Sequence, residues 1–149
     1  DLGNDHAFAP VYPTHPGTPE QRRQDHAAAR RLLEQAGHAR GLAITLTIEQ
    51  FEDVPQYGIF VKEMCKPAGI DVKLEILSQA QYYGSMDNQP WLQVPAGITD
   101  WASRGTASQT IGPAYRCGAV WNSAHWCNQE FERLLHEFDG ELDLQRRRE

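Results

Sequence analysis

The sequence has little that a nucleic-acid-binding or membrane-spanning protein requires. Its 14 basic residues are outnumbered by 20 acidic residues, which gives a net charge of −6. Phosphate contacts need a basic face, so this charge argues against a nucleic-acid partner. No stretch approaches 18 consecutive apolar residues, which excludes a spanning helix. The catalytic and nucleotide-binding motifs HExxH, GxSxG, GxxxxGK[ST] and GxGxxG are also absent.

Internal repeats and low-complexity segments are absent as well, and the composition is that of a folded domain. The 149 residues are 40% hydrophobic and include four Trp, five Tyr and five Phe. A compact chain of this length buries about two thirds of its unfolded surface, enough for one core. Neither an initiator Met nor a signal peptide precedes Asp1, and residues 145–149 are a charged run. We therefore expect a piece of a longer protein.

The first part of the sequence predicts an extended segment and then a helix. Residues 1–17 hold three prolines and little periodicity, which is typical of a loop-like lead-in. Thr18 would cap the helix, Pro19 suits its first position, and Gly37 would end it. Its apolar stripe consists of Ala29, Leu32, Leu33 and Ala36, and the opposite charged face is expected to lie in water.

The clearest pattern predicts a strand, a helix and a second strand. Apolar residues alternate over 42–48 and again over 72–76, as in strands. Asp53 opens a helix between them that Gly69 closes, with Pro67 tightening its last turn. Its apolar positions are Tyr57, Phe60, Val61, Met64 and Ala68. This βαβ unit predicts parallel strands with a right-handed crossover and hence an α/β fold.

The remaining elements are less regular. We expect a short helix at 79–83, a strand over 91–101 and a long irregular connection over 104–124. Connections of that length are usually functional. A further helix starts near Gln129, with Phe131, Leu134, Leu135 and Phe138 as its buried stripe, and Asp143 begins another.

Three cysteines allow more than one interpretation. In an oxidising compartment Cys117 and Cys127 would form a disulfide worth about 3 kcal/mol, and Cys65 would be a small buried side chain. A metal site would instead gather Cys117, His125, Cys127 and His136, although their spacing fits no standard zinc pattern.

Asp100 and Trp101 form the most suggestive polar–aromatic pair. They end the strand expected over 91–101, at the point where an irregular loop starts. Sheets of α/β proteins hold ligands at such places. The alternative is a buried Trp beside a capping Asp, and periodicity does not separate the two.

Several segments resemble motifs of a known family. Residues 98–104 (Ile-Thr-Asp-Trp-Ala-Ser-Arg) are similar to the ligand-site motif of the family 5 extracellular solute-binding proteins, and residues 121–135 continue the similarity. Residues 25–37 resemble the family's alanine-rich helix, 68–72 its step into a strand, and 142–147 its D-x-x-x-R motif. The resemblance covers nearly the whole chain in the right order.

The resemblance implies a fold and a function. Family members are the dipeptide- and oligopeptide-binding components of ABC importers, and whole members are longer and close two lobes on a ligand. Residues 18–149 would then form part of the C-terminal lobe of a periplasmic binding protein type II-like fold. The protein would be exported to the periplasm or cell exterior, which fits a Cys117–Cys127 disulfide. It would bind a peptide or peptide-like solute, deliver it to a membrane permease, and need no cofactor; the isolated piece could self-associate.

The resemblance also carries over site residues one at a time. Trp101 matches the aromatic that packs along the bound peptide. Well-known peptide binders hold the ligand ammonium with an Asp three residues later, but here that position is Arg104, so Asp100 would have to replace that anchor. Arg104 suits a carboxylate, so we expect a ligand with an anionic or strong acceptor group. Tyr83 and Asn122 are second-tier ligand candidates, as are Tyr82 and Tyr115.

Two other functions stay open at this point. A metal or metallophore carrier of the same family would contact its cargo through His6 or His125. A hydrolase or transferase would use Asp100, His125 and Cys127, but nothing in the sequence supplies its oxyanion donors or an oriented base.

Overall fold

The computed structural model describes residues 23–102, 104, 107–143 and 145–148. These residues divide into two compact units, each described by itself. The sheet unit is Gln24–Ala102, and the helical unit comprises the described residues from 104 onward. The lead-in expected over 1–17 and the helix cap expected at Thr18 lie outside the described residues.

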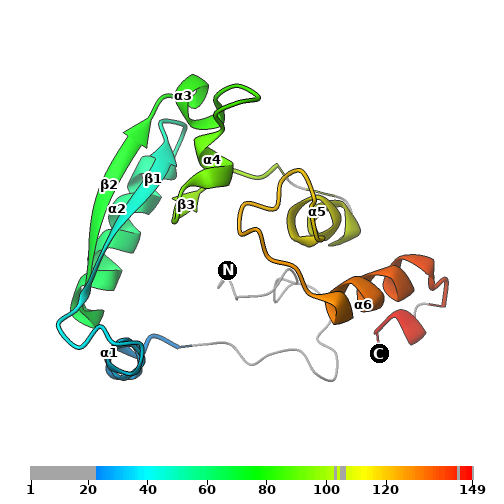
Figure 1. The fold of residues 1–149 in the computed structure, drawn as a ribbon, viewed down its shortest axis with the longest axis horizontal. Coiled ribbons are helices and arrows are strands. Elements are labelled where there is room, and N and C mark those ends of the chain that lie inside the picture. Colours follow the sequence, from blue (N-terminus) through cyan, green and yellow to red (C-terminus); the bar gives the residue numbers. More distant parts are fainter. Residues whose placement is uncertain (1–22, 103, 105–106, 144, 149) are drawn as a thin grey trace. The chain divides into compact units, whose positions relative to one another are not determined.

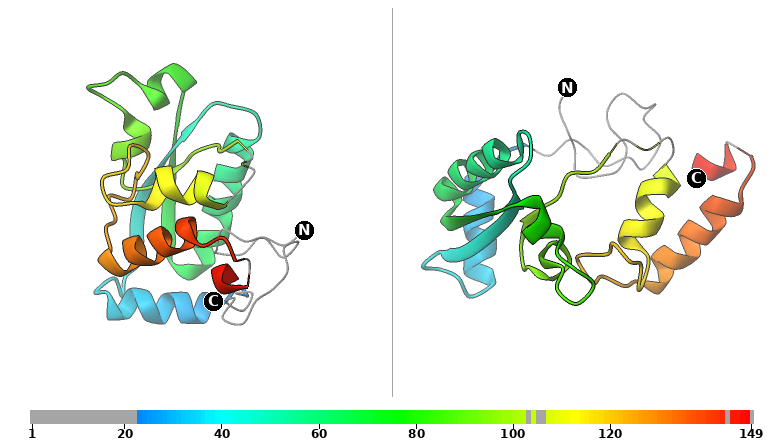
Figure 2. Two further views of the ribbon diagram at one scale, coloured as in Figure 1. Left: turned by 90° about the vertical axis from the view of Figure 1, so that its right-hand side faces the viewer. Right: turned by 90° about the horizontal axis from the view of Figure 1, so that it is seen from above.

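The sheet unit is built on three parallel strands. β1 (Leu42–Glu49) lies between β2 (Ile70–Leu77) and the short β3 (Gly97–Ile98). α2 (Val54–Cys65) and the 3₁₀ turn η1 (Lys66–Ala68) connect β1 to β2, and α2 lies along one face of that pair (Figures 1 and 2). The predicted βαβ unit and α/β class are confirmed, including the tightened helix end at Pro67.

The core of this unit lies between the strands and α2. Leu46, Ile48 and Val72 are buried, and Val61 and Cys65 of α2 pack against them. Gly58 allows the close approach of the helix, because a Cβ there would lie 2.6 Å from Cδ1 of Ile48.

The buried face of α2 differs from the predicted stripe. Tyr57, Phe60 and Met64 are 61%, 66% and 47% exposed, so their assignment to a buried stripe is wrong. The predicted Val61 does pack against the sheet, and Gly58, which was not predicted, faces it as well. Apolar residues occur around most of this helix, so periodicity alone did not identify the side that packs.

The first helix starts later than predicted. α1 spans His26–Gln35, and residues 23–25 are not helical, so a helix running on from Thr18 is wrong. Asp25 is the cap, because its Oδ1 accepts a hydrogen bond from the Ala28 N–H at 2.8 Å. Gly37, at φ +86°, ends the helix as predicted.

The strand predicted over 91–101 is also wrong. α3 (Gln79–Tyr83) is confirmed, but the short helix α4 (Pro90–Gln93) follows it, and β3 is only two residues long. Pro90 explains the difference, since proline favours the first turn of a helix and cannot donate to a sheet.

The helical unit contains α5 (Ala107–Tyr115), α6 (Gln129–Gly140) and the 3₁₀ turn η2 (Arg146–Arg148). The irregular connection expected over 104–124 is therefore wrong across α5, whose sequence of Ser, Thr, Gly and Pro disguises a helix. α6 begins as predicted, with Asn128 accepting from the Phe131 N–H at 3.0 Å. Leu135 is buried but Leu134 is half exposed, and Asp143 caps η2. No helix in the described part of the chain has the length and apolarity to cross a membrane.

Candidate ligand site

The carboxyl ends of the three strands place two predicted site segments at one edge of the sheet. β1, β2 and β3 run parallel, so they end together at Glu49, Leu77 and Ile98. α3, which carries Tyr83, follows β2 at this edge (Figure 1). Asp100 and Trp101 follow β3. Parallel sheets present their ligand sites at this edge.

Glu49 joins these segments. Its side chain is fully buried. Oε1 accepts from the Tyr83 hydroxyl at 2.8 Å and from the Asp100 backbone N–H at 3.3 Å. Oε2 accepts from Nε2 of Gln79 at 3.0 Å. The structure thus brings Tyr83 and Asp100 together through a carboxylate that sequence reasoning missed. The sequence carried no signal of this burial, because Glu49 lies on the same face of the strand as the polar Thr45 and Thr47.

Tyr82 makes a second connection between α3 and the end of β3. The side chain is fully buried, and its hydroxyl donates to the Ile98 carbonyl at 3.0 Å. That uses its single proton, so the Thr99 hydroxyl, 2.9 Å away, donates to it in turn. Tyr82 therefore holds the segment before Asp100 in place from the inside of the unit.

Both tyrosines remain hydrogen-bond donors across the physiological pH range. Burial raises the pKa of Tyr82 above its ordinary value, the Glu49 charge adds to this, and the Thr99 hydrogen bond opposes it. Burial also raises the pKa of Tyr83, and the hydrogen bond to Glu49 and the nearby negative charge raise it further. Around this edge, Asp100 is exposed and Trp101 is half-buried. Both residues of the predicted pair are therefore at least partly exposed.

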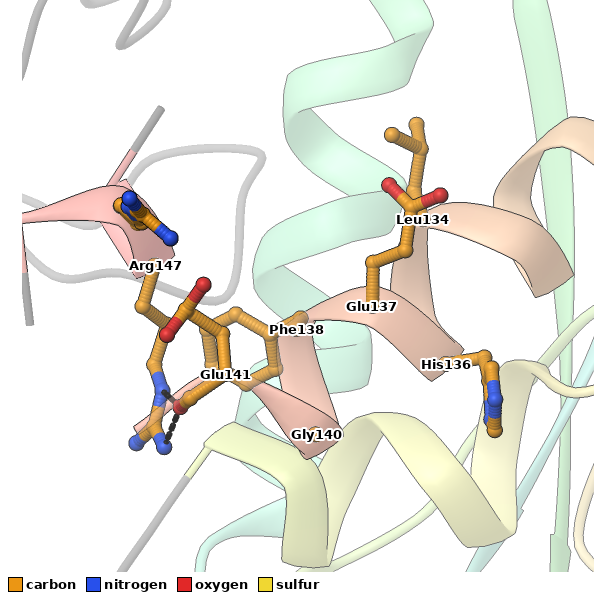
Figure 3. Close-up of a pocket in the computed structure, with 8 residues that line it drawn as sticks. Leu134, His136, Glu137, Phe138, Gly140, Glu141 and Arg147 are labelled. Atoms are coloured by element: carbon orange, nitrogen blue, oxygen red, sulfur yellow. Dashed lines mark hydrogen bonds between the residues drawn. The ribbon is translucent and has the colours of Figure 1, made fainter. Parts of the chain in front are cut away.

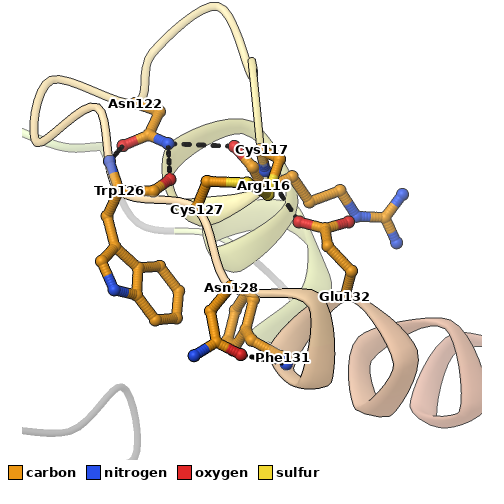
Figure 4. Close-up of a disulfide and its surroundings, with 8 residues drawn as sticks. All are labelled: Arg116, Cys117, Asn122, Trp126, Cys127, Asn128, Phe131 and Glu132. Atoms are coloured by element: carbon orange, nitrogen blue, oxygen red, sulfur yellow. Dashed lines mark hydrogen bonds between the residues drawn. A yellow bond between two sulfur atoms is a disulfide. The ribbon is translucent and has the colours of Figure 1, made fainter.

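In the helical unit a disulfide closes a loop that contains Asn122. Cys117 and Cys127 are bonded, with their Cα atoms 4.6 Å apart (Figure 4). Asn122 is buried, and its Nδ2 donates to the carbonyls of Arg116 at 3.0 Å and Trp126 at 2.7 Å. Its Oδ1 accepts from the Trp126 N–H at 3.3 Å. The Asn122 amide therefore braces the loop from within. Arg104, in the same unit, is exposed.

Comparison with known proteins identifies the fold. No protein-family model matches the sequence, and no curated protein matches it. Several solved structures, however, match the structure of this chain. The periplasmic binding protein DppA of Helicobacter pylori, in complex with the peptide STSA, gives a TM-score of 0.78 at 19% identity, over 99% of this chain and 29% of that one. The chain has the fold of the family 5 solute-binding proteins.

Further solved structures with this fold extend the comparison. NikA of Staphylococcus aureus, in complex with Ni(L-His)2, gives a TM-score of 0.71 at 17% identity, over 87% of this chain and 28% of that one. OppA of Burkholderia pseudomallei gives 0.67 at 25% identity, over 82% and 24%. This chain therefore spans less than a third of each of these proteins. The family resemblance drawn from the sequence is confirmed at the level of the fold.

Within this solute-binding fold, the predicted site residues divide between the two units. Tyr83, Asp100 and Trp101 belong to the sheet unit, whereas Arg104 and Asn122 belong to the helical unit. Tyr83 and Asp100 are gathered at Glu49, and Trp101 directly follows them. The other second-tier candidate, Tyr115, ends α5 and is 48% exposed.

The disulfide argues against the two alternative chemistries. The sulfurs of Cys117 and Cys127 are bonded to each other, so neither is a thiolate able to hold zinc or act as a nucleophile. No group of three or more His, Cys, Asp or Glu in the described ranges could hold a metal ion. The structural neighbours described above are binding proteins, and none of them is described as an enzyme.

A pocket of about 550 Å³ lies between α6 and η2 in the helical unit (Figure 3). It is lined by Leu134, His136, Glu137, Phe138, Gly140, Glu141, Arg146 and Arg147. The Arg147 guanidinium crosses it, donating to the Glu141 carbonyl and lying 5.5 Å from the centre of the Phe138 ring. None of the predicted ligand residues lines this pocket, and one of its two arginines, Arg147, is bonded within the chain itself.

Proposed function

We propose that this chain is part of the C-terminal lobe of the substrate-binding component of an ABC importer. The complete protein would be exported, capture a peptide or a related small solute outside the membrane, and deliver it to a permease. Two observations support this. The fold is that of DppA and OppA, and the observation that carries the proposal is the convergence of Tyr83 and Asp100 on Glu49 at the carboxyl edge of the sheet.

Each of the main predicted ligand residues has a chemical part in the proposed function. Trp101 offers a flat apolar ring that packs along a ligand main chain. Asp100, exposed beside it, attracts a cationic group such as an ammonium. Arg104 offers a planar fork of donors that fits a carboxylate. A ligand recognised by Arg104 would carry an anionic group, and a ligand anchored by Asp100 would carry a cationic one.

Replacing Arg104 with alanine is expected to weaken binding of the best acidic ligand by about tenfold to a hundredfold, since a charge-assisted pair is worth about 1.5–3 kcal/mol. Titration calorimetry of the complete protein against a panel of neutral and acidic peptides measures this. Arg133→Ala is the matched control, because it removes the same charge from an exposed helix position paired with Glu130 and Glu137. Unchanged affinity in Arg104→Ala would contradict the role of Arg104.

A metal-chelate cargo is the second candidate, because NikA has the same fold and was solved with Ni(L-His)2. The described residues offer no cluster of three metal-binding side chains, so a metal would have to arrive already held by a small chelator. Elemental analysis of the complete protein, purified without an affinity tag, separates the two. Stoichiometric metal would favour the chelate, and a retained peptide without metal would favour the first proposal.

A further inference from the structure

We infer that Glu49 is the residue that positions the Asp100–Trp101 segment for ligand. That a ligand binds this segment rests on the proposed function. That Glu49 holds the segment in place rests on the geometry of the sheet unit. Glu49 touches no ligand-facing surface, because its side chain is fully buried. It acts through the backbone of Asp100 and through α3.

The Glu49 carboxylate is costly to keep in a buried position. Burying a charge is strongly unfavourable unless it is paired or fully hydrogen-bonded. In the described part of the chain no basic side chain forms an ion pair with Glu49; its compensation is the set of donors from Gln79, Tyr83 and Asp100. Those donors are therefore drawn to fixed places by the charge, more strongly than by a neutral acceptor.

The three groups that donate hydrogen bonds to Glu49 come from two separate parts of the chain. Gln79 and Tyr83 lie at the two ends of α3, and Asp100 lies beyond β3. Tyr83 and Asp100 share the same oxygen, Oε1, so a shift of α3 is transmitted to the Asp100 backbone. Asp100 precedes Trp101, so the direction in which the chain leaves the sheet toward Trp101 depends on this bond.

The segment before Asp100 is held in place independently of Glu49. Tyr82 binds the Ile98 carbonyl and the Thr99 hydroxyl, and Thr47 donates its backbone N–H to Ala96 at 3.0 Å. Loss of Glu49 should therefore leave β3 in place and release the backbone N–H of Asp100. This separates a positioning role from general support of the fold.

The test measures backbone amide exchange of the complete protein, without added ligand, in Glu49→Leu and Glu49→Gln. We expect the Asp100 amide to exchange at least tenfold faster in Glu49→Leu, while amides in the middle of β1 and β2 keep their rates. Glu49→Gln keeps an acceptor oxygen and should restore most of the protection. Glu75→Leu is the matched control, because Glu75 accepts from the Thr47 hydroxyl in the neighbouring strand, so its loss should leave Asp100 unchanged.

Two further measurements complete the design. Tyr83→Phe removes one donor but leaves the Asp100 bond, so Asp100 should stay within threefold of the wild-type rate. Where Glu49→Leu does not fold, Glu49→Ala replaces it, with the same acceleration expected at Asp100. Calorimetry with the peptide STSA is then run on the same variants. Unchanged Asp100 exchange in both Glu49 variants, or equal acceleration across the whole sheet unit, would overturn the inference. A wild-type protein that binds no peptide, with the expected exchange pattern, would instead contradict the proposed function alone.

Discussion

Gly84→Ala is expected to lower the free energy of unfolding by about 3 kcal/mol or more, because the strain of a forbidden backbone conformation adds to a steric collision. Gly84 ends α3 at φ +62° and ψ −149°. A Cβ there would lie 1.8 Å from the Asn88 carbonyl oxygen and 2.9 Å from its carbon. Both are backbone atoms, so no side-chain rotation relieves the contact. Urea denaturation followed by circular dichroism measures the loss.

The control for this prediction is Gly37→Ala. Gly37 also has a positive φ, +86°, but a Cβ there would meet nothing within 4 Å. It should lose only about 1 kcal/mol, the penalty of a left-handed residue with a Cβ. Equal losses in the two variants would show that the collision with Asn88 is relieved elsewhere, and would contradict the packing described for the turn after α3.

Reducing the Cys117–Cys127 disulfide is expected to destabilise the helical unit by about 3 kcal/mol, since the bond closes a loop of this length. Their sequence separation is 10 residues, and the same loop holds the Asn122 brace and ends at the cap of α6. Thermal unfolding with and without dithiothreitol measures the change. The sheet unit contains only the free Cys65, so its transition should not move.

The control is the double variant Cys117→Ala/Cys127→Ala, which should unfold at the reduced midpoint in either condition. A wild-type protein with the same midpoint in both conditions would mean that the disulfide does not contribute. A shift in the sheet unit as large as in the helical unit would mean that the two units do not unfold independently of each other.

The elements predicted well are those in which one periodicity dominates. Residues 42–48 alternate without interruption, so β1 and its partner β2 followed from the pattern. The strand expected over 91–101 failed because Pro90 starts a helix, and α5 was missed because Ser, Thr, Gly and Pro are poor helix formers that the surroundings override. The propensity of single residues says nothing of tertiary contacts such as the hydrogen bond from Ser108 of α5 to Asp139 of α6.

The candidate site was predicted only in part for a similar reason. Asp100 and Trp101 could be placed at the strand end from the sequence, because parallel strands share one edge. Glu49 could not, since a carboxylate at the end of a strand ordinarily faces water. Its burial depends on α3 folding over it, and on the tyrosines that α3 carries. Asn122, named from the sequence as a second-tier ligand candidate, directs its Nδ2 to the carbonyls of Arg116 and Trp126 and so braces its loop.

The most direct test of the proposed function is mass spectrometry of the small molecules that the complete protein retains through purification. Trp101→Ala is run beside the wild type, because the account places Trp101 against the ligand. We expect a peptide or peptide-like solute to be released from the wild type on denaturation, and Trp101→Ala to retain at least tenfold less. A wild type that retains no solute, and binds none from a peptide library, would contradict it.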